Sequence, residues 1–265
     1  MLPDLAVKTA QVRQMIDAAQ QITVLTGAGI STDSGIPDFR GPNGVWTKNP
    51  GAEKSANIAN FVRDPEVRKN SWRRYLDGGV WVDREPNAGH RALVDLEARG
   101  KLHTLITQNV DGLHLKAGTS KAKLVEIHGT MAEAACLSCA RRWPIEAILK
   151  RVRAGDADPH CENCNGLVKS ATISFGQALV VADLERSDRA ANACDLMLAV
   201  GTSLTVTPIA NVVPIAYRHG AKVVIVNAEP TPVDGIAHAV LRAGISELLP
   251  QLVRSEGLLP RANRS

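Results

Sequence analysis

The chain has 265 residues, of which 45% are hydrophobic and 22% are charged. These fractions are close to globular averages, so they exclude collagen, coiled coil and disorder as descriptions of the whole chain. The formal net charge is only +4, which does not by itself indicate a nucleic-acid partner. Aromatic residues make up only 3%, so the core must be built mostly from Ala, Val, Leu and Ile.

The sequence shows neither of the two apolar segments that would direct a protein to or across a membrane. No apolar run approaches the ~18 residues that a membrane-spanning helix requires. The first residues, MLPDLAVKTA, contain no apolar block of the length found in secretory signals. We therefore expect a cytoplasmic protein with no membrane partner. Cysteines stay reduced there, so closely spaced pairs favour a metal site over disulfides.

The first elements of the chain predict a dinucleotide-binding unit. Apolar residues at helical spacing predict a helix over Leu5–Ala19, and the β-branched run Gln21–Thr26 predicts a strand. The turn Gly27-Ala28-Gly29 and a helix-permissive segment, Ile30–Gly35, follow. Gly27 and Gly29 would let the backbone approach a pyrophosphate, and amides at a helix start favour anionic oxygens.

Further strands and helices alternate along the chain. Apolar runs predict strands at Leu102–Thr107, Lys123–Ile127, Ala171–Ser174, Leu196–Val200 and Lys222–Val226. Helices are predicted at Asn87–Arg99, Leu184–Ala193 and Ile209–His219. This alternation predicts an α/β fold with a parallel sheet covered on both faces, as in Rossmann-type lobes.

Two stretches interrupt the alternation and predict a smaller second lobe. Residues 43–83 form an expected helical insertion that carries Trp46, Trp72 and Trp81, and residues 131–169 form an expected zinc-binding module. The Rossmann-type lobe would then comprise residues 1–42, 84–130 and 170–253. The polar and basic residues 254–265 predict a flexible tail.

The glycine turn departs from the pattern of an ordinary dehydrogenase. Thr32 stands where the third fingerprint glycine is expected, and no acidic residue follows a second strand at the position that binds ribose. Hydride transfer is therefore disfavoured. The loop continues to Asp38, Phe39 and Arg40, which offer a carboxylate, an aromatic face and a guanidinium; an ordinary surface loop is the alternative.

Four of the five cysteines predict a structural zinc site. Cys136 and Cys139 are separated by two residues, as are Cys161 and Cys164, and 21 residues lie between the pairs. Four thiolates form a closed tetrahedral site with no position for water, which indicates a structural role. His160 is a further candidate that the site does not need. Cys194 is expected to be a small buried residue.

Several motifs together resemble the sirtuin family of NAD-dependent protein lysine deacylases. They are Gly27–Ser31 with Gly35–Arg40, Thr107–His114, His128-Gly129, the cysteine pairs, Phe175-Gly176, Gly201–Ser203 and Val226-Asn227. They occur in the family's order. The resemblance implies a Rossmann-type lobe and a smaller zinc-plus-helical lobe, with NAD and acyl-lysine entering between them. It also implies nicotinamide and O-acyl-ADP-ribose as products.

The resemblance also implies roles for individual residues. His128 would be the general base for a ribose hydroxyl, and Asn109 would be catalytic. Phe175 and Gly176 would bind substrate peptide as an edge strand. Phe39 would shield the reactive sugar. NAD contacts would come from Gly27, Ala28, Gly29, Asp38, Phe39, Arg40, Gln108, Asp111, Gly201, Thr202, Ser203, Asn227 and Ile245.

Departures from the family pattern leave the acyl and peptide preference open. Gln177 stands where the family commonly has Glu, and Ser170–Ile173 replaces the usual Pro and Val-Val. The segment Trp72–Gly78 does not reproduce the Tyr-x-x-Arg signature of desuccinylases. Acyl-lysine proteins are the expected partners, nucleic acid is not, and the oligomeric state is open. The alternatives are a mono-ADP-ribosyltransferase and a catalytically silent NAD- or nucleic-acid-binding module.

Overall fold

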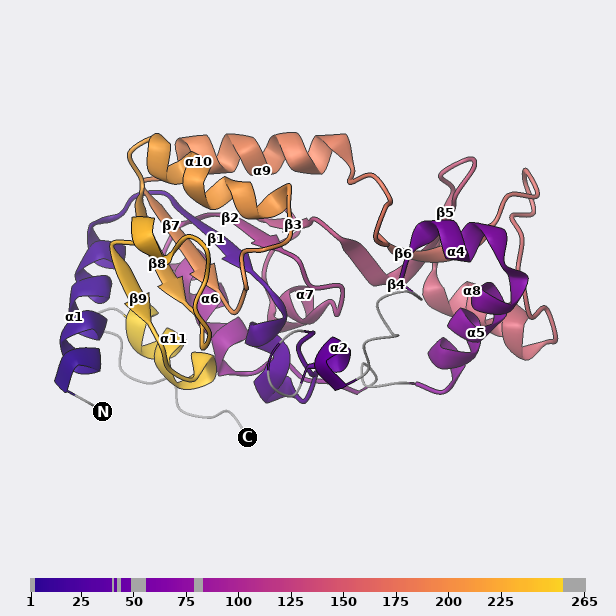
Figure 1. Ribbon diagram of the computed structural model, residues 1–265, viewed down its shortest axis with the longest axis horizontal. Helices are drawn as coiled ribbons and strands as arrows, with labels where there is room; N and C mark the ends of the chain where they lie inside the picture. The colour runs from indigo at the N-terminus through magenta and orange to yellow at the C-terminus, as the bar shows by residue number, and fades with distance from the viewer. Residues whose placement is uncertain (1–2, 40, 42–43, 49–55, 79–82, 255–265) are drawn as a thin grey trace.

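A six-stranded parallel sheet forms the larger of two lobes (Figure 1). The structure, a computed structural model, describes residues 3–39, 41, 44–48, 56–78 and 83–254. The strand order is β3-β2-β1-β7-β8-β9. The strands are β1 (Ile22–Thr26), β2 (Leu102–Thr107), β3 (Leu124–Glu126), β7 (Leu196–Val200), β8 (Lys222–Val226) and β9 (Ala239–Leu241). The order reverses between β1 and β7, and this is where open α/β sheets bind ligands.

Helices cover both faces of this sheet. On one face, α1 (Pro3–Ala18), α6 (Ala88–Ala98) and α11 (Ile245–Val253) pack on a core that includes Val24 and Leu198. On the other face, α9 (Val181–Ala193) and α10 (Val212–Arg218) pack on a core that includes Leu25 and Ala199. Every residue of β1 and β7 is buried, which explains their continuous apolar sequences. The predicted α/β fold class is confirmed.

Short elements connect the larger ones at the carboxyl edge of the sheet. The glycine turn leads into a 3₁₀ helix, η1 (Ala28–Ser34), where the sequence predicted a helix start. The helix α7 (Leu113–Ala117) follows β2, and the 3₁₀ helices η3 (Ile209–Asn211) and η4 (Asp234–Ile236) follow β7 and β8.

The smaller lobe is built from the two interruptions of the α/β pattern. It contains a three-stranded antiparallel sheet of β5 (Arg142–Pro144), β4 (Gly129–Cys136) and β6 (Val168–Thr172), with the helix α8 (Ile145–Arg153). The helices α2 (Val45–Lys48), α4 (Ile58–Arg63) and α5 (Pro65–Leu76) come from the other interruption. Figure 1 shows α4, α5 and α8 grouped around this sheet, away from the large lobe.

Packing and one ion pair join the two parts of the small lobe. Trp72 on α5 is 1% exposed and packs in a cluster with Cys136, Cys161 and Ile148. The Arg68 guanidinium donates to both Asp158 oxygens, at 2.7 to 3.1 Å, and to two carbonyls of the α4 segment. The helical segment and the cysteine-bearing segment therefore share one core.

One predicted strand was assigned to the wrong sheet. The sequence placed Ala171–Ser174 in the parallel sheet, whereas the strand is Val168–Thr172 and pairs antiparallel with β4. A short apolar run does not encode the direction of its partner, so periodicity could not separate the two sheets. The strand β9 and the helix α11 were not predicted; the former has only three residues and the latter contains Pro250.

Some predictions concern residues outside the described part of the chain. These are Arg40, Trp81, the side chain of Trp46 and tail residues 255–265. The boundaries proposed for the sequence segments remain predictions. Among the described residues, no helix is long and apolar enough to cross a membrane.

Candidate functional site

The predicted site residues gather at the carboxyl edge of the parallel sheet. Gly27 follows β1, Gln108 follows β2, Gly201 follows β7 and Asn227 follows β8 directly. His128 lies two residues beyond the end of β3. Since all six strands are parallel, these residues come together at one edge. The switch point between β1 and β7 is the centre of this edge.

Close packing of two loops explains the glycines at the switch point. The Gly27 amide donates to the Val200 carbonyl at 3.1 Å, and the Gly29 amide donates to the Gly201 carbonyl at 2.8 Å. A Cβ at Gly201 would lie 2.5 Å from the Ile30 nitrogen, and the Gly201 φ is +62°. The glycines are therefore needed for loop contact within the chain, and their contact with a pyrophosphate stays a prediction.

A buried hydrogen-bond network joins the predicted residues Asn109 and Asp111 through Ser31. Asn109 Nδ2 donates to Ser31 Oγ at 3.0 Å and to the Gly27 carbonyl at 3.2 Å. Ser31 Oγ in turn donates to Asp111 Oδ2 at 2.7 Å. Burial raises the pKa of Asp111, opposed by hydrogen bonds from the Leu113 amide and Ser31. The network fixes these polar groups in a desolvated position beside the glycine turn.

His128 is held as a neutral imidazole with one defined tautomer. Its Nδ1 lies 3.0 Å from the Gln108 carbonyl, which can only accept, so Nδ1 carries the proton and Nε2 is left with a lone pair. Burial lowers the pKa of His128, while the bond to Gln108 acts in the opposite direction. Near neutral pH, Nε2 can therefore accept a proton, as a general base must.

The residue after His128 must be glycine. Gly129 has a φ of +74°, and a Cβ there would lie 2.0 Å from the Ala171 carbonyl oxygen. The His128 carbonyl accepts from the Ile173 amide at 2.7 Å. This bond places His128 beside Ile173, two residues before Phe175 and Gly176, which are predicted to bind substrate peptide.

Two residues that the sequence analysis did not assign support the glycine turn. Asn87 caps α6, and its Nδ2 donates to the Ile30 carbonyl at 2.7 Å. His90, in the same capping box, lies 3.4 Å from Ser31 Oγ and has a pKa lowered by burial to about 4. The capping pattern was visible in the sequence, but its contact with the turn depends on tertiary packing.

The other residues predicted to contact NAD differ in their surroundings: some are hydrogen-bonded within the chain, and one is covered by the core. Gln108 Nε2 donates to Thr202 Oγ1 at 2.8 Å, and Ser203 Oγ lies 2.8 Å from Thr205 Oγ1. Asn227 is buried, and its Nδ2 donates to the Glu229 carbonyl. Ile245 is 8% exposed and belongs to the core between α6 and the sheet, so its side chain is largely covered by protein.

The polar loop after η1 is partly described. Asp38 Oδ1 accepts from the Gly41 amide at 3.1 Å, and the Asp38 carbonyl accepts from the Val45 amide at 2.9 Å. Phe39 is half-buried. Arg40 lies outside the described residues, so its predicted phosphate contact remains a prediction. The carboxylate of Asp38 therefore helps to shape the loop.

The backbone of Phe175 is already paired within the chain. Its amide donates to the Ala56 carbonyl at 3.0 Å, and its carbonyl accepts from the Ile58 amide at 3.0 Å. Its side chain is 37% exposed. Gln177 Oε1 accepts from the Ser174 amide and closes a turn around Gly176. An added peptide strand would therefore have to use backbone groups beyond those of Phe175.

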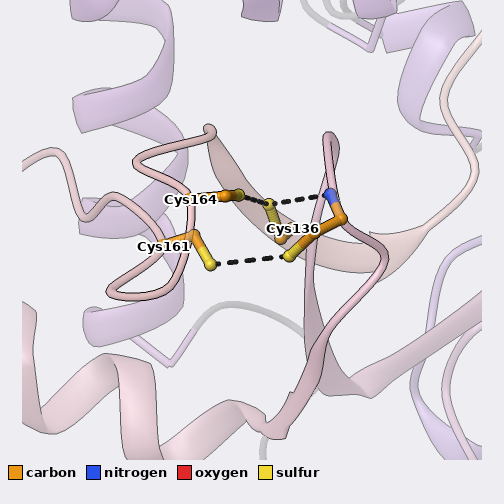
Figure 2. A group of neighbouring side chains, drawn as sticks. Cys136, Cys161 and Cys164 are labelled. Carbon is orange, nitrogen blue, oxygen red and sulfur yellow. Dashed lines mark hydrogen bonds between the residues drawn. The ribbon is translucent and has the colours of Figure 1, made fainter.

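The four paired cysteines converge at one point of the small lobe. Their sulfur atoms all lie within 4.8 Å of one another. The Cys136 and Cys164 sulfurs are 3.5 Å apart, and those of Cys139 and Cys161 are 3.7 Å apart. Figure 2 shows Cys136, Cys161 and Cys164 pointing toward one another. Four Zn–S bonds of ~2.3 Å in a tetrahedron require sulfur separations of about 3.8 Å, so the arrangement fits one Zn²⁺.

The local backbone favours the thiolate form of Cys136. The Ser138 and Cys139 amides donate to Cys136 Sγ at 3.3 and 3.5 Å. Although burial acts to raise it, the pKa of Cys136 is lowered by these bonds to about 6. His160 Nδ1 instead bonds to the Asn165 carbonyl at 2.9 Å. Cys194 is buried in the large-lobe core, as predicted.

A doubly wound nucleotide-binding lobe joined to a four-thiolate module is the class of protein that the fold and site define. The family model described as "Sir2 family" matches residues 27–208. An NAD-dependent protein deacetylase of Streptomyces coelicolor is 47% identical over 89% of this chain and 98% of its own length. One of Bradyrhizobium diazoefficiens is 40% identical over 93% and 95%.

Solved structures give the same result. A structure from work on the mechanism and regulation of Sir2 enzymes has a TM-score of 0.82 and 35% identity, covering 93% of this chain and 96% of its own. A Sir2 structure bound to an acetylated peptide has a TM-score of 0.80 and 30% identity, over 92% and 96%. The chain belongs to the Sir2 family, and the resemblance to sirtuins is confirmed.

Proposed function

We propose that this protein is an NAD-dependent protein-lysine deacylase, most simply a deacetylase, that releases nicotinamide and O-acyl-ADP-ribose. Two relatives with at least 40% identity are NAD-dependent protein deacetylases, and one solved Sir2 neighbour carries a peptide and NAD⁺. The observation that carries the proposal is the position of His128. A neutral imidazole lies beside Ile173 and at the same sheet edge as the glycine turn.

The residues at the sheet edge fit NAD. The switch point presents tightly packed glycine turns that carry no side chain to block a pyrophosphate, while the Gly27 and Gly29 amides already donate to the Val200 and Gly201 carbonyls. Amide and hydroxyl side chains of Gln108, Asn109 and Ser203 surround it, and these suit ribose hydroxyls and a carboxamide. NAD would supply the glycosidic bond that is broken and the ribose that receives the acyl group.

In the proposed mechanism the chain mainly orients groups and moves one proton. The network of Asn109, Ser31 and Asp111 fixes polar groups in a desolvated position beside the glycine turn, where alignment of the reactants is most effective. Once the acyl-lysine oxygen has displaced nicotinamide from the ribose, His128 Nε2 would accept the proton of a ribose hydroxyl, which would attack the acyl carbon. The carbon–nitrogen bond to lysine would then break with the entry of one water, so that the lysine amine leaves and the acyl group stays on the ribose. Nδ1 stays bonded to Gln108 throughout, so the ring keeps its orientation.

The thiolate cluster would hold one zinc ion in a structural role. All four ligand positions are cysteines, so no site is left for water or substrate. The ion would stabilise the sheet of β4, β5 and β6, since Cys136 ends β4 and the other ligands lie in loops between its strands. Its effect on the chemistry would be indirect.

The decisive experiment is a mass-spectrometric assay of one peptide sequence carrying acetyl, propionyl, succinyl or long-chain acyl lysine, with and without NAD. We expect NAD-dependent loss of the acyl group, fastest for acetyl-lysine, with nicotinamide formed at the same time. Adenylate label from NAD appearing on protein with no deacylation would instead identify a mono-ADP-ribosyltransferase. Absence of any turnover with bound NAD would identify a silent binding module.

A further inference from the structure

A second concave surface lies at the opposite edge of the parallel sheet from the proposed NAD site. It encloses about 510 Å³ and is lined by residues that include His103, Lys123, Arg186 and Arg189. His103 is the second residue of β2, and Lys123 comes directly before β3, so both lie at the amino ends of the strands. The arginines belong to α9, which covers this part of the sheet in Figure 1.

The charges on this surface are not neutralised within the described chain. No acidic residue lines it, and no described carboxylate forms an ion pair with Lys123 or Arg186. Arg189 lies 3.6 Å from Glu185, and both side chains are more than 60% exposed. An ion pair this exposed contributes little to stability, so Glu185 does not hold Arg189 away from a ligand. Three cations, Lys123, Arg186 and Arg189, therefore share this surface.

The basic residues of the cysteine module give a contrast. They are Arg141, Arg142, Lys150, Arg151 and Arg153, and we refer to them as the basic face of the module. Ion pairs in the structure join Arg142 to Glu133, Arg151 to Asp156 and Arg153 to Glu146. Most of that face is therefore internally compensated, whereas the surface between α9 and β2 is not.

Two of the lining side chains are held in place. The Arg186 guanidinium donates to the Leu124 carbonyl at 2.9 Å and to the Ala122 carbonyl, which restricts its plane without removing its charge. The buried Thr104 hydroxyl lies 3.1 Å from His103 Nδ1 and orients that ring. Burial lowers the pKa of His103, and the positive charges of Lys123 and Arg186 lower it further.

We propose that this surface binds a small anion that carries a phosphate group. Guanidinium and ammonium groups are the usual protein partners of phosphate, and a fixed guanidinium loses little entropy on binding. The cavity has the volume of a small-molecule site, and no Phe, Tyr or Trp side chain lines it to stack nucleic-acid bases. Ala122 and Ala190 provide its apolar walls. The site is separate from the deacylation edge and does not depend on the proposed activity.

The test uses His103 as a reporter inside the site. An anion bound between His103 and Lys123 would favour the imidazolium, so binding must raise the pKa of His103. The full chain, labelled with ¹³C at histidine rings, would be titrated with acid by NMR, with the His103→Gln variant identifying the signal. Separate titrations would contain chloride, inorganic phosphate, pyrophosphate or sulfate at equal ionic strength. Sulfate keeps its charge over the whole pH range, which separates binding from ionisation of the anion itself.

Two matched lysine variants distinguish binding at a specific site from a non-specific effect of overall charge. We expect inorganic phosphate or pyrophosphate to raise the pKa of His103 by about one unit relative to chloride, equivalent to tenfold tighter binding to the imidazolium. Lys123→Gln should remove most of this shift, whereas Lys121→Gln, which alters an exposed lysine outside the cavity, should retain it. A sulfate response with the same dependence on Lys123 would also support the site.

Three results would overturn the proposal. One is the absence of a shift with both phosphate and pyrophosphate. Another is an equal loss of the shift in Lys121→Gln and Lys123→Gln, which would mean that only overall charge matters. The third is a shift produced by a single-stranded oligonucleotide but not by the small anions, which would indicate a nucleic-acid surface instead.

Discussion

The large lobe and the small lobe reach stability by different physical means. In the large lobe, β1 and β7 are wholly buried between two layers of helices, and each face of the sheet has its own apolar cluster. The small lobe has a three-stranded sheet and one apolar cluster, in which two of the buried residues are the cysteines Cys136 and Cys161. Apolar burial dominates in the first lobe, whereas the second combines a smaller apolar cluster with four cysteines whose arrangement fits one zinc ion.

The two lobes also differ in their expected contribution to the reaction. The proposed base, His128, follows a strand of the large lobe, and its neighbour Gly129 begins a strand of the small lobe. The site therefore lies where the two lobes join. Changes in the large-lobe edge should affect the reaction directly, and changes in the small lobe should act through the position of residues 129 and 173.

The largest expected effect is on the reaction. His128→Ala should lower deacylation by a factor of about 10² to 10⁴, the usual contribution of a general base. Zinc content and melting temperature should stay near those of the wild type, because Nδ1 makes a single bond to the Gln108 carbonyl. His219→Ala, which changes an exposed histidine, is the matched control. Unchanged turnover in His128→Ala would refute the assigned role.

The next effect should be confined to the small lobe. Cys136→Ala removes one of four thiolates, so bound zinc measured by atomic absorption should fall well below one per chain. Amide hydrogen exchange should accelerate over residues 129–172 and remain slow in β1 and β7. Cys194→Ala, which removes a buried thiol from the large lobe, should retain zinc. Equal zinc in the two variants would contradict the structural site.

A substitution at the switch point should destabilise the large lobe. Gly201→Ala places a Cβ 2.5 Å from the Ile30 nitrogen at a φ of +62°. Overpacking and backbone strain together should cost about 4 kcal/mol, which urea denaturation can measure. Gly235→Ala is the control, since its Cβ would meet no atom within 4 Å. Unfolding of both variants at the same urea concentration would contradict the tight packing between the glycine turn and Gly201.

Acid should weaken the large lobe through its buried histidines. His90 is neutral in the fold with a pKa of about 4, whereas it protonates near its ordinary value of 6.5 when unfolded. The unfolded chain then binds more protons between these values, so stability is lost as the pH falls from 6.5 toward 4, by about 3 kcal/mol in total. In His90→Gln, the free energy of unfolding should fall less steeply as the pH is lowered. A slope identical to that of the wild type would show that His90 is not the cause.

Sequence patterns predicted the elements whose whole environment is apolar. The strands β7 and β8 were placed with their observed ends, because buried parallel strands have continuous apolar sequences. The cysteine spacing likewise predicted a cluster that the structure forms. The direction of β6 could not be predicted, because its pairing with β4 is set by the fold of the small lobe as a whole.

Contacts between segments far apart in the chain could not be predicted from the sequence. The capping residues Asn87 and His90 gave a local signal, but their bonds to Ile30 and Ser31 cross about 60 positions of the chain. The pairing of Phe175 with Ala56 and Ile58 arises in the same way. Such contacts need the tertiary arrangement, which no local pattern specifies.

The stoichiometry of one turnover tests the central claim most directly. Purified protein with an acetyl-lysine peptide and NAD would be quenched at intervals, and lysine peptide, nicotinamide and O-acetyl-ADP-ribose would be quantified together by mass spectrometry. The account predicts equal amounts of all three, and none when NAD is left out. Deacetylated peptide formed at full rate without NAD, or in excess over nicotinamide, would contradict it.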